Sequence, residues 1–245
     1  RIKGTSTLYD VTTGEAKLQW VKTTEDQAQQ DAKLRAIVEA LKSDLPIYKR
    51  AYRPSGKRPD HLLNLIPMGD PHFGLLCWAK EVGEDFNLEI ARRDLCGAVD
   101  YLVSQAPAAK RCLIFNAGDF FHVDNMDNQT PANHHSLDVD SRMAKIIDIG
   151  VLAFRQAIES GLSRHEIVEV VCSRANHDPV LGLALTVLLK HVYSDNPRVV
   201  IHAQPTFRHY VKHGLVLLGF CHGHQTKDAQ LPGIMATERA KDWGD

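Results

Sequence analysis

The spacing of apolar residues along positions 62–192 alternates between two patterns. Three short apolar runs have the length of buried strands: residues 62–68, 112–115 and 167–172. Three longer stretches place apolar residues three or four positions apart, as one face of a helix does: residues 88–102, 143–158 and 179–192. Strands that alternate with helices of this length predict an α/β fold with a mainly parallel sheet.

A second set of strands is predicted after this region, without helices between them. The apolar runs lie at residues 199–202, 207–212 and 215–221, and a helical pattern follows at residues 231–243. His213 and Gly214 fit a tight turn between the last two strands. Residues 61–245 are therefore expected to form the main domain.

Residues 1–60 are predicted to form a smaller N-terminal part. Residues 6–22 alternate apolar and polar side chains around a turn sequence, which predicts a hairpin. Residues 24–43 combine a capping-box spacing with a helical apolar stripe. The connector at residues 49–58 carries five positive charges and no acidic residue, so it is either a solvated linker or a strip that contacts phosphates.

Composition narrows the class of protein. Hydrophobic residues make up 44% and charged residues 24% of the chain, which excludes disordered, collagen-like and coiled-coil proteins. The net charge of −1 gives no global basic field for nucleic acid, and no apolar run is long enough to predict a membrane partner. The five cysteines are odd in number and widely spaced, which favours reduced thiols and a cytoplasmic location.

Carboxylate, amide and imidazole side chains follow four of the predicted strands. In chain order they are Asp70 and His72; Asp119 and His122; Asn176, His177 and Asp178; and His222 and His224. Because ligands bind at the carboxyl ends of strands in α/β sheets, we expect these side chains to converge on one site. Such ligands, without thiolate, favour Mn²⁺, Fe²⁺ or Zn²⁺. Asp119 could bridge two ions about 3.5–4 Å apart that hold a hydroxide nucleophile.

Four short motifs in this region resemble successive motifs of the calcineurin-like metallophosphoesterases. They are Gly-Asp-Pro-His at 69–72, Gly-Asp-Phe-Phe-His at 118–122, Asn-His-Asp at 176–178 and Cys-His-Gly-His at 221–224. Each motif is short, but four in the family's order make the resemblance specific. It implies a two-sheet sandwich flanked by helices, preceded here by the small N-terminal hairpin and helix. It also implies two divalent metal ions, with manganese expected and iron or zinc as alternatives.

The resemblance implies a metal-binding role for several of these side chains. Asp70 and His72 match ligands of a first metal, and Asp119 matches the ligand that both metals share. Asn176 and His222 match ligands of the second metal.

The same resemblance implies roles in catalysis and substrate binding. His177 matches the histidine that protonates the leaving oxygen, and Asp178 is its expected orienting partner. His122 is either a substrate-facing or a structural histidine. Arg174 is a candidate for gripping a phosphate, with a surface ion pair as the alternative.

Two features depart from the family's pattern. Ala175 stands where the family has glycine before Asn-His, and only one late histidine motif, at residues 221–224, is present where the family has two. If this is the earlier motif, the closing one lies beyond Asp245 and the domain is incomplete; the helical pattern after the strand favours this interpretation. If it is the closing motif, His224 is a ligand too. The earlier ligand is then one of His191, His202, His209 and His213.

The second motif favours a nuclease-like activity. Its Gly-Asp-x-Phe-His pattern is similar to that of the SbcD-type DNA nucleases, whereas protein Ser/Thr phosphatases have Gly-Asp-x-x-Asp-Arg-Gly there. The whole chain, with Ser-Thr-Leu-Tyr at 6–9 and Trp-Val-Lys at 20–22, is similar to metallophosphoesterases of tailed phages and prophages. We therefore expect a phosphodiesterase that acts on DNA or a nucleotide. The alternatives are a phosphomonoesterase on a nucleotide or phosphoprotein, and a non-catalytic scaffold.

Overall fold

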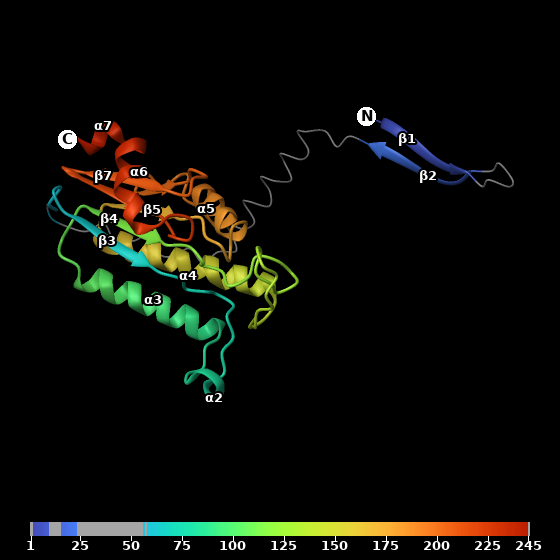
Figure 1. The fold of residues 1–245 in the computed structure, drawn as a ribbon, viewed down its shortest axis with the longest axis horizontal. Coiled ribbons are helices and arrows are strands. Elements are labelled where there is room, and N and C mark those ends of the chain that lie inside the picture. The colour runs from blue at the N-terminus through green and yellow to red at the C-terminus, as the bar shows by residue number, and fades with distance from the viewer. Residues whose placement is uncertain (1, 10–15, 24–55, 57, 245) are drawn as a thin grey trace. The chain divides into compact units, whose positions relative to one another are not determined.

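The computed structural model describes residues 2–9, 16–23, 56 and 58–244, which belong to two compact units (Figure 1). The first unit, Arg1–Ile47, contains β1 (Ile2–Tyr9) and β2 (Ala16–Thr23). These strands pair antiparallel, which confirms the predicted hairpin. The helix predicted at 24–43 and most of the basic connector lie outside the described residues.

A parallel four-stranded sheet forms the centre of the second unit, Tyr48–Asp245. Its strands are adjacent in chain order: β3 (Leu63–Met68), β4 (Arg111–Asn116), β5 (Ile167–Cys172) and β6 (Val199–His202). The register aligns Met68 with Asn116, and Asn116 with Cys172. The carboxyl ends of the first three strands therefore meet at one edge of the sheet.

Three long helices cover one face of this sheet. They are α3 (Leu88–Gln105), α4 (Met143–Arg164) and α5 (Leu181–Val192). Their apolar stripes share one hydrophobic core with Ile66, Ile114 and Val170 of the strands. The alternation of strands and helices predicted from the sequence is confirmed, and a one-turn helix that it did not predict, α2 (Ala79–Val82), precedes α3.

A two-stranded antiparallel sheet packs on the opposite face. Its strands are β7 (His209–His213) and β8 (Val216–Phe220). Val211 and Phe220 of this hairpin contact Leu113 and Val171 of the parallel sheet in a second, smaller core. Side chains on neighbouring positions of a strand point to opposite faces, so β4 and β5 are buried from both sides.

The C-terminal helical segment lies against this hairpin. Tyr210 and Arg208 both bond to Glu238 of α6 (Leu231–Glu238). The single helix predicted at 231–243 is wrong, because Arg239 adopts φ −128° and ψ 41° and separates α6 from α7 (Ala240–Trp243). Among the helices that the structure describes, none combines the length and the apolar character needed to cross a membrane.

Candidate metal centre

Backbone hydrogen bonds join the loops that follow β3, β4 and β5. The N–H of Ala117 donates to Met68 O at 2.9 Å, and the N–H of Ser173 donates to Asn116 O at 2.9 Å. The N–H of His72 donates to Asp119 O at 3.1 Å. These bonds bring the predicted site residues to the carboxyl edge of the sheet, as the sequence predicted.

The backbone at this edge is strained at three predicted ligands. Asp70, His72 and Asp119 have φ values of 42°, 46° and 48°, in the left-handed region that non-glycine residues rarely adopt. Such strain gathers at functional sites, because the surrounding structure must hold it in place.

Gly118 is needed for the close approach of two of these loops. Its φ is 107°, and a Cβ atom there would lie 2.5 Å from the Cβ of Ala175 and 3.1 Å from Nδ1 of His222. Ala175, which stands in place of the family's glycine, is buried and is not among the described residues with positive φ. An alanine is therefore compatible with the backbone at that position.

Two carboxylates and one imidazole form a first group of candidate ligands. Asp70, Asp119 and His222 each offer one ligand atom, and these atoms all lie within 4.8 Å of one another. His222 Nε2 lies 3.4 Å from Asp119 Oδ2 and 2.9 Å from Asn176 Oδ1, so the predicted amide ligand adjoins the group. Nδ1 of His222 lies 2.9 Å from the carbonyl oxygen of Ala117, which orients the ring.

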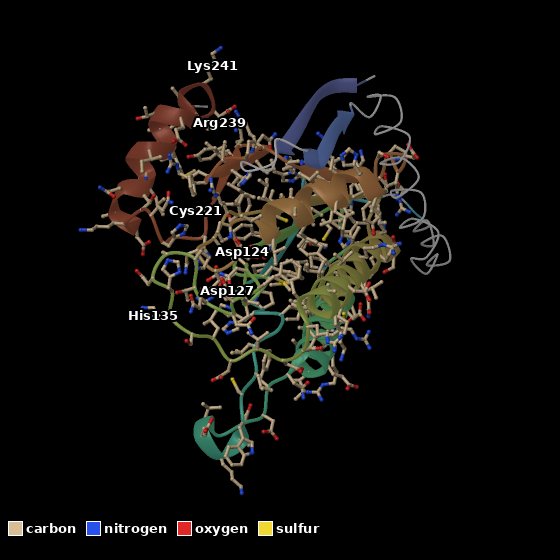
Figure 2. All side chains as sticks on the ribbon, turned by 90° about the vertical axis from the view of Figure 1, so that its right-hand side faces the viewer. Asp124, Asp127, His135, Cys221, Arg239 and Lys241 are labelled. Carbon is tan, nitrogen blue, oxygen red and sulfur yellow. The ribbon has the colours of Figure 1, made fainter. Side chains whose placement is uncertain are left out.

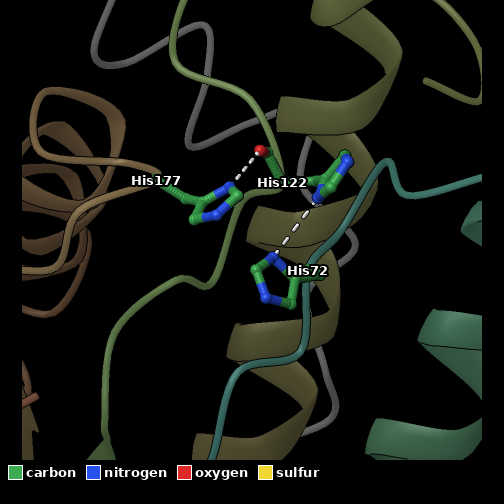
Figure 3. A group of neighbouring side chains, drawn as sticks. All are labelled: His72, His122 and His177. Atoms are coloured by element: carbon green, nitrogen blue, oxygen red, sulfur yellow. Dashed lines mark hydrogen bonds between the residues drawn. The ribbon is translucent and has the colours of Figure 1, made fainter. Parts of the chain in front are cut away.

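Three imidazoles form a second group of candidate ligands (Figure 3). His72, His122 and His177 offer ring nitrogens within 4.8 Å of one another. The Nδ1 atoms of His72 and His122 are 3.4 Å apart, and Nδ1 of His177 lies 3.0 Å from the carbonyl oxygen of His122. Burial lowers the pKa of His72 and takes the pKa of His122 to about 4, and neighbouring imidazoles add to both shifts. Near neutral pH these two rings are therefore uncharged and can bind a cation.

The two groups are joined through Asp119. This side chain is buried, and its Oδ1 accepts the backbone N–H of His177 at 2.8 Å while its Oδ2 faces His222. Its position between the groups agrees with the central role predicted for it. The ring of His72 groups with those of His122 and His177, and the carboxylates of Asp119 and Asp70 are near enough to oppose the effect of burial on its pKa.

Asp178 does not take the position predicted for it. We expected it to orient His177, but the ring nitrogen Nδ1 of His177 faces the carbonyl oxygen of His122. The carboxylate of Asp178 instead accepts the backbone N–H of Phe121 at 3.0 Å. Burial raises its pKa from 3.8 to about 7. Asp178 therefore ties the β5 loop to the β4 loop.

The remaining predicted residues lie at the border of the site. The ring centroid of His224 is 5.1 Å from that of His222, and the Arg174 guanidinium lies 4.8 Å from the ring centroid of Phe207. Arg174, Phe207, His222 and His224 line one small pocket. The four other late histidines named from the sequence belong to neither ligand group of the described residues: His191, His202, His209 and His213.

The segment between β4 and α4 contributes a helix cap beside the site. Figure 2 labels Asp124, Asp127 and His135 of this segment, and Cys221, which directly precedes His222. The carboxylate of Asp124 accepts the N–H groups of Val180 and Leu181 at 3.0 and 2.7 Å, at the start of α5. His135 is exposed in the same segment.

The sequence placed His122 at the same strand end as Asp119 but interpreted it as a substrate-facing or structural histidine, not as a metal ligand. The signal for a ligand role was its position three residues after Asp119, in the loop that follows β4. Comparisons with known proteins found no family model, no curated protein and no solved structure that matches this chain.

Proposed function

We propose that this protein is a metal-dependent phosphoesterase of the calcineurin-like type and that it hydrolyses phosphodiesters. The observation that carries the proposal is the convergence of Asp70, Asp119, Asn176 and His222 beside His177 at the carboxyl edge of the sheet. The layered arrangement supports it, because the parallel sheet packs on a second sheet on one face and on α3, α4 and α5 on the other, and α6 contacts the second sheet.

The donor set fits divalent metal ions. Asp70, His72 and Asp119 would hold one ion, and Asp119, Asn176 and His222 would hold a second, so that the shared carboxylate lies between them. Carboxylate, amide oxygen and imidazole donors without thiolate suit Mn²⁺ best, with Fe²⁺ and Zn²⁺ as alternatives. Bound ions would supply charge stabilisation for the phosphoryl oxygens and a more acidic water.

His177 is placed to carry the proton of the leaving group. Its backbone N–H is fixed by Asp119 Oδ1, and its ring Nδ1 lies within hydrogen-bond distance of His122 O. An N–H at Nδ1 that donates to this carbonyl leaves Nε2 to hold the transferable proton. Protonation of the leaving oxygen by a positioned imidazole contributes about 10²–10⁴-fold in rate.

The test is hydrolysis of bis-p-nitrophenyl phosphate and p-nitrophenyl phosphate with Mn²⁺ and with a chelator. We expect faster cleavage of the diester, and loss of this activity on chelation and in Asp119→Asn. Preferred cleavage of the monoester would show a phosphomonoesterase instead. No Mn²⁺-dependent cleavage of either compound would favour the non-catalytic alternative.

A further inference from the structure

Two arginines beside the candidate metal centre differ in their partners. Arg174 and Arg208 line the same small pocket as His222 and His224. The Arg208 guanidinium is paired with the carboxylate of Glu238, and its Nε lies 3.1 Å from both carboxylate oxygens. Arg174 has no hydrogen bond and no ion pair to any residue that the structure describes. Its positive charge is therefore available to an anionic ligand.

An aromatic ring holds the Arg174 guanidinium. The central carbon of the guanidinium lies 4.8 Å from the ring centroid of Phe207, within the range of cation–π attraction. The same ring lies 6.2 Å from the ring of His224, which lies 5.1 Å from that of His222. An arginine side chain loses rotamer freedom when a ligand fixes it, so a ring that fixes it beforehand lowers the cost of binding.

The residues on both sides of Phe207 fix its position. The hydroxyl of Thr206 donates to Arg208 O at 2.8 Å, so a hydrogen bond spans Phe207. The N–H of Thr206 donates to Gln204 O at 2.8 Å. On the other side, the pair of Arg208 and Glu238 ties the segment to α6. Phe207 is half-buried, and these bonds set where its ring meets Arg174.

We propose that Phe207 is a positioning residue that presents the Arg174 guanidinium to the phosphoryl oxygens of a substrate at the metal centre. The inference rests on the proposed function and deepens it, because it assigns the group that orients this arginine. Arg174 lies two positions before Asn176, the proposed ligand of the second metal. Its planar fork matches two oxygens of a phosphate. Phe207 acts on substrate binding through Arg174 and touches no reacting atom.

The first test is steady-state kinetics with bis-p-nitrophenyl phosphate and Mn²⁺. Arg174→Ala removes the charge-assisted hydrogen bonds and should raise KM about 10- to 100-fold. Phe207→Leu keeps an apolar side chain but removes the ring, and should raise KM about two- to fivefold with kcat unchanged. Phe207→Tyr keeps the ring and should keep the KM of the native protein. An unchanged KM in Arg174→Ala or in Phe207→Leu would overturn the inference.

A double-mutant cycle shows whether Phe207 acts through its partner. In an Arg174→Ala background, Phe207→Leu should leave KM unchanged. A merely structural role would raise KM or lower kcat by the same factor in both backgrounds, and that result would overturn the inference. The matched control is Trp78→Leu, which removes a ring 5.1 Å from Nζ of Lys80 at the start of α2. This variant should keep both KM and kcat.

A binding measurement separates this inference from the proposed function. Isothermal titration calorimetry with inorganic phosphate and Mn²⁺ needs no hydrolysis, and we expect the affinity to fall from the native protein to Phe207→Leu and further to Arg174→Ala. This order in a protein that cleaves neither nitrophenyl ester would overturn the proposed function and support the role of Phe207. Cleavage of the diester with equal KM and equal phosphate affinity in all three proteins would overturn that role and leave the phosphoesterase proposal standing.

Discussion

His177 is held at one ring nitrogen and at its backbone, and in the proposed assignment it carries a proton and is not one of the metal ligands. His177→Asn removes the transferable proton without changing the proposed ligands. We expect hydrolysis of a dialkyl phosphate to fall about 10²–10⁴-fold, and hydrolysis of bis-p-nitrophenyl phosphate to fall less, because nitrophenolate needs little protonation. Steady-state kinetics with Mn²⁺ measures both losses, and His135→Asn in the exposed loop is the control. Equal losses on the two esters would exclude the general-acid role.

Asp178 should make the stability of the metal-free protein depend on pH. Burial raises its pKa from 3.8 to about 7, so between these values the folded state holds a proton that the unfolded state has lost. The stability that this proton contributes is full below pH 3.8 and is lost as the pH rises through 7, by up to about 1.4 kcal/mol per pH unit.

Asp178→Asn keeps an oxygen acceptor for the N–H of Phe121 but does not titrate. We therefore expect its melting temperature, relative to the native protein, to increase between pH 5 and pH 7.5, measured with chelator present. The lowered pKa of His122 makes stability rise with pH, which opposes the effect of Asp178. His122 is present in both proteins, so its contribution cancels when the two melting temperatures are subtracted. A difference that stays constant with pH would contradict the assignment.

The identity of most site residues could be predicted from the sequence, but their side-chain partners could not. Asp119 and Asn176 follow buried strands, and the rule that strand ends converge was enough to place them together. The partners of His72 and Asp178 depend on the direction of each side chain. For His72 the backbone is left-handed, which a pattern of apolar positions does not reveal.

The loop after β4 depends on Gly118, and its substitution tests the packing of the site. In Gly118→Ala the new Cβ would meet Ala175 at 2.5 Å, and φ of 107° would be strained. We expect a loss of about 2–6 kcal/mol in unfolding free energy, because backbone strain and overpacking cost about 1–3 kcal/mol each. Urea denaturation measures the loss.

Gly214→Ala is the matched control for this prediction. Gly214 also has positive φ, 58°, but a Cβ there would meet nothing within 4 Å. We expect a loss of only about 1–2 kcal/mol, which is the cost of left-handed backbone alone. Similar losses in the two variants would show that contact with Ala175 does not matter.

The predicted bounds of an element matched the observed bounds where the sequence signal was a continuous run of apolar residues. The strands predicted at residues 167–172 and 199–202 are β5 and β6 without change. The sequence missed α2, because four residues are too short for a periodic pattern, and it missed the break at Arg239, where apolar residues continue on both sides. Local patterns do not record such backbone changes.

The packing of the two sheets is a property of the second unit as a whole. Leu113 and Val171 of the parallel sheet contact Val211 and Phe220 of the hairpin, so the end of β8 is fixed against the sheet. His222 follows β8 by two residues and thereby reaches Asp119 across the two sheets. The sequence predicted all of these strands but not which face the hairpin covers, because that depends on contacts distant in the chain.

Manganese binding followed by electron paramagnetic resonance tests the proposed metal centre most directly. Two ions that share the Asp119 carboxylate would lie about 3.5–4 Å apart, close enough for their spins to couple. We predict two Mn²⁺ per chain with the spectrum of a coupled pair, and loss of that coupling in Asp119→Asn. A single uncoupled Mn²⁺ per chain whose affinity is unchanged in Asp119→Asn would contradict the dinuclear centre.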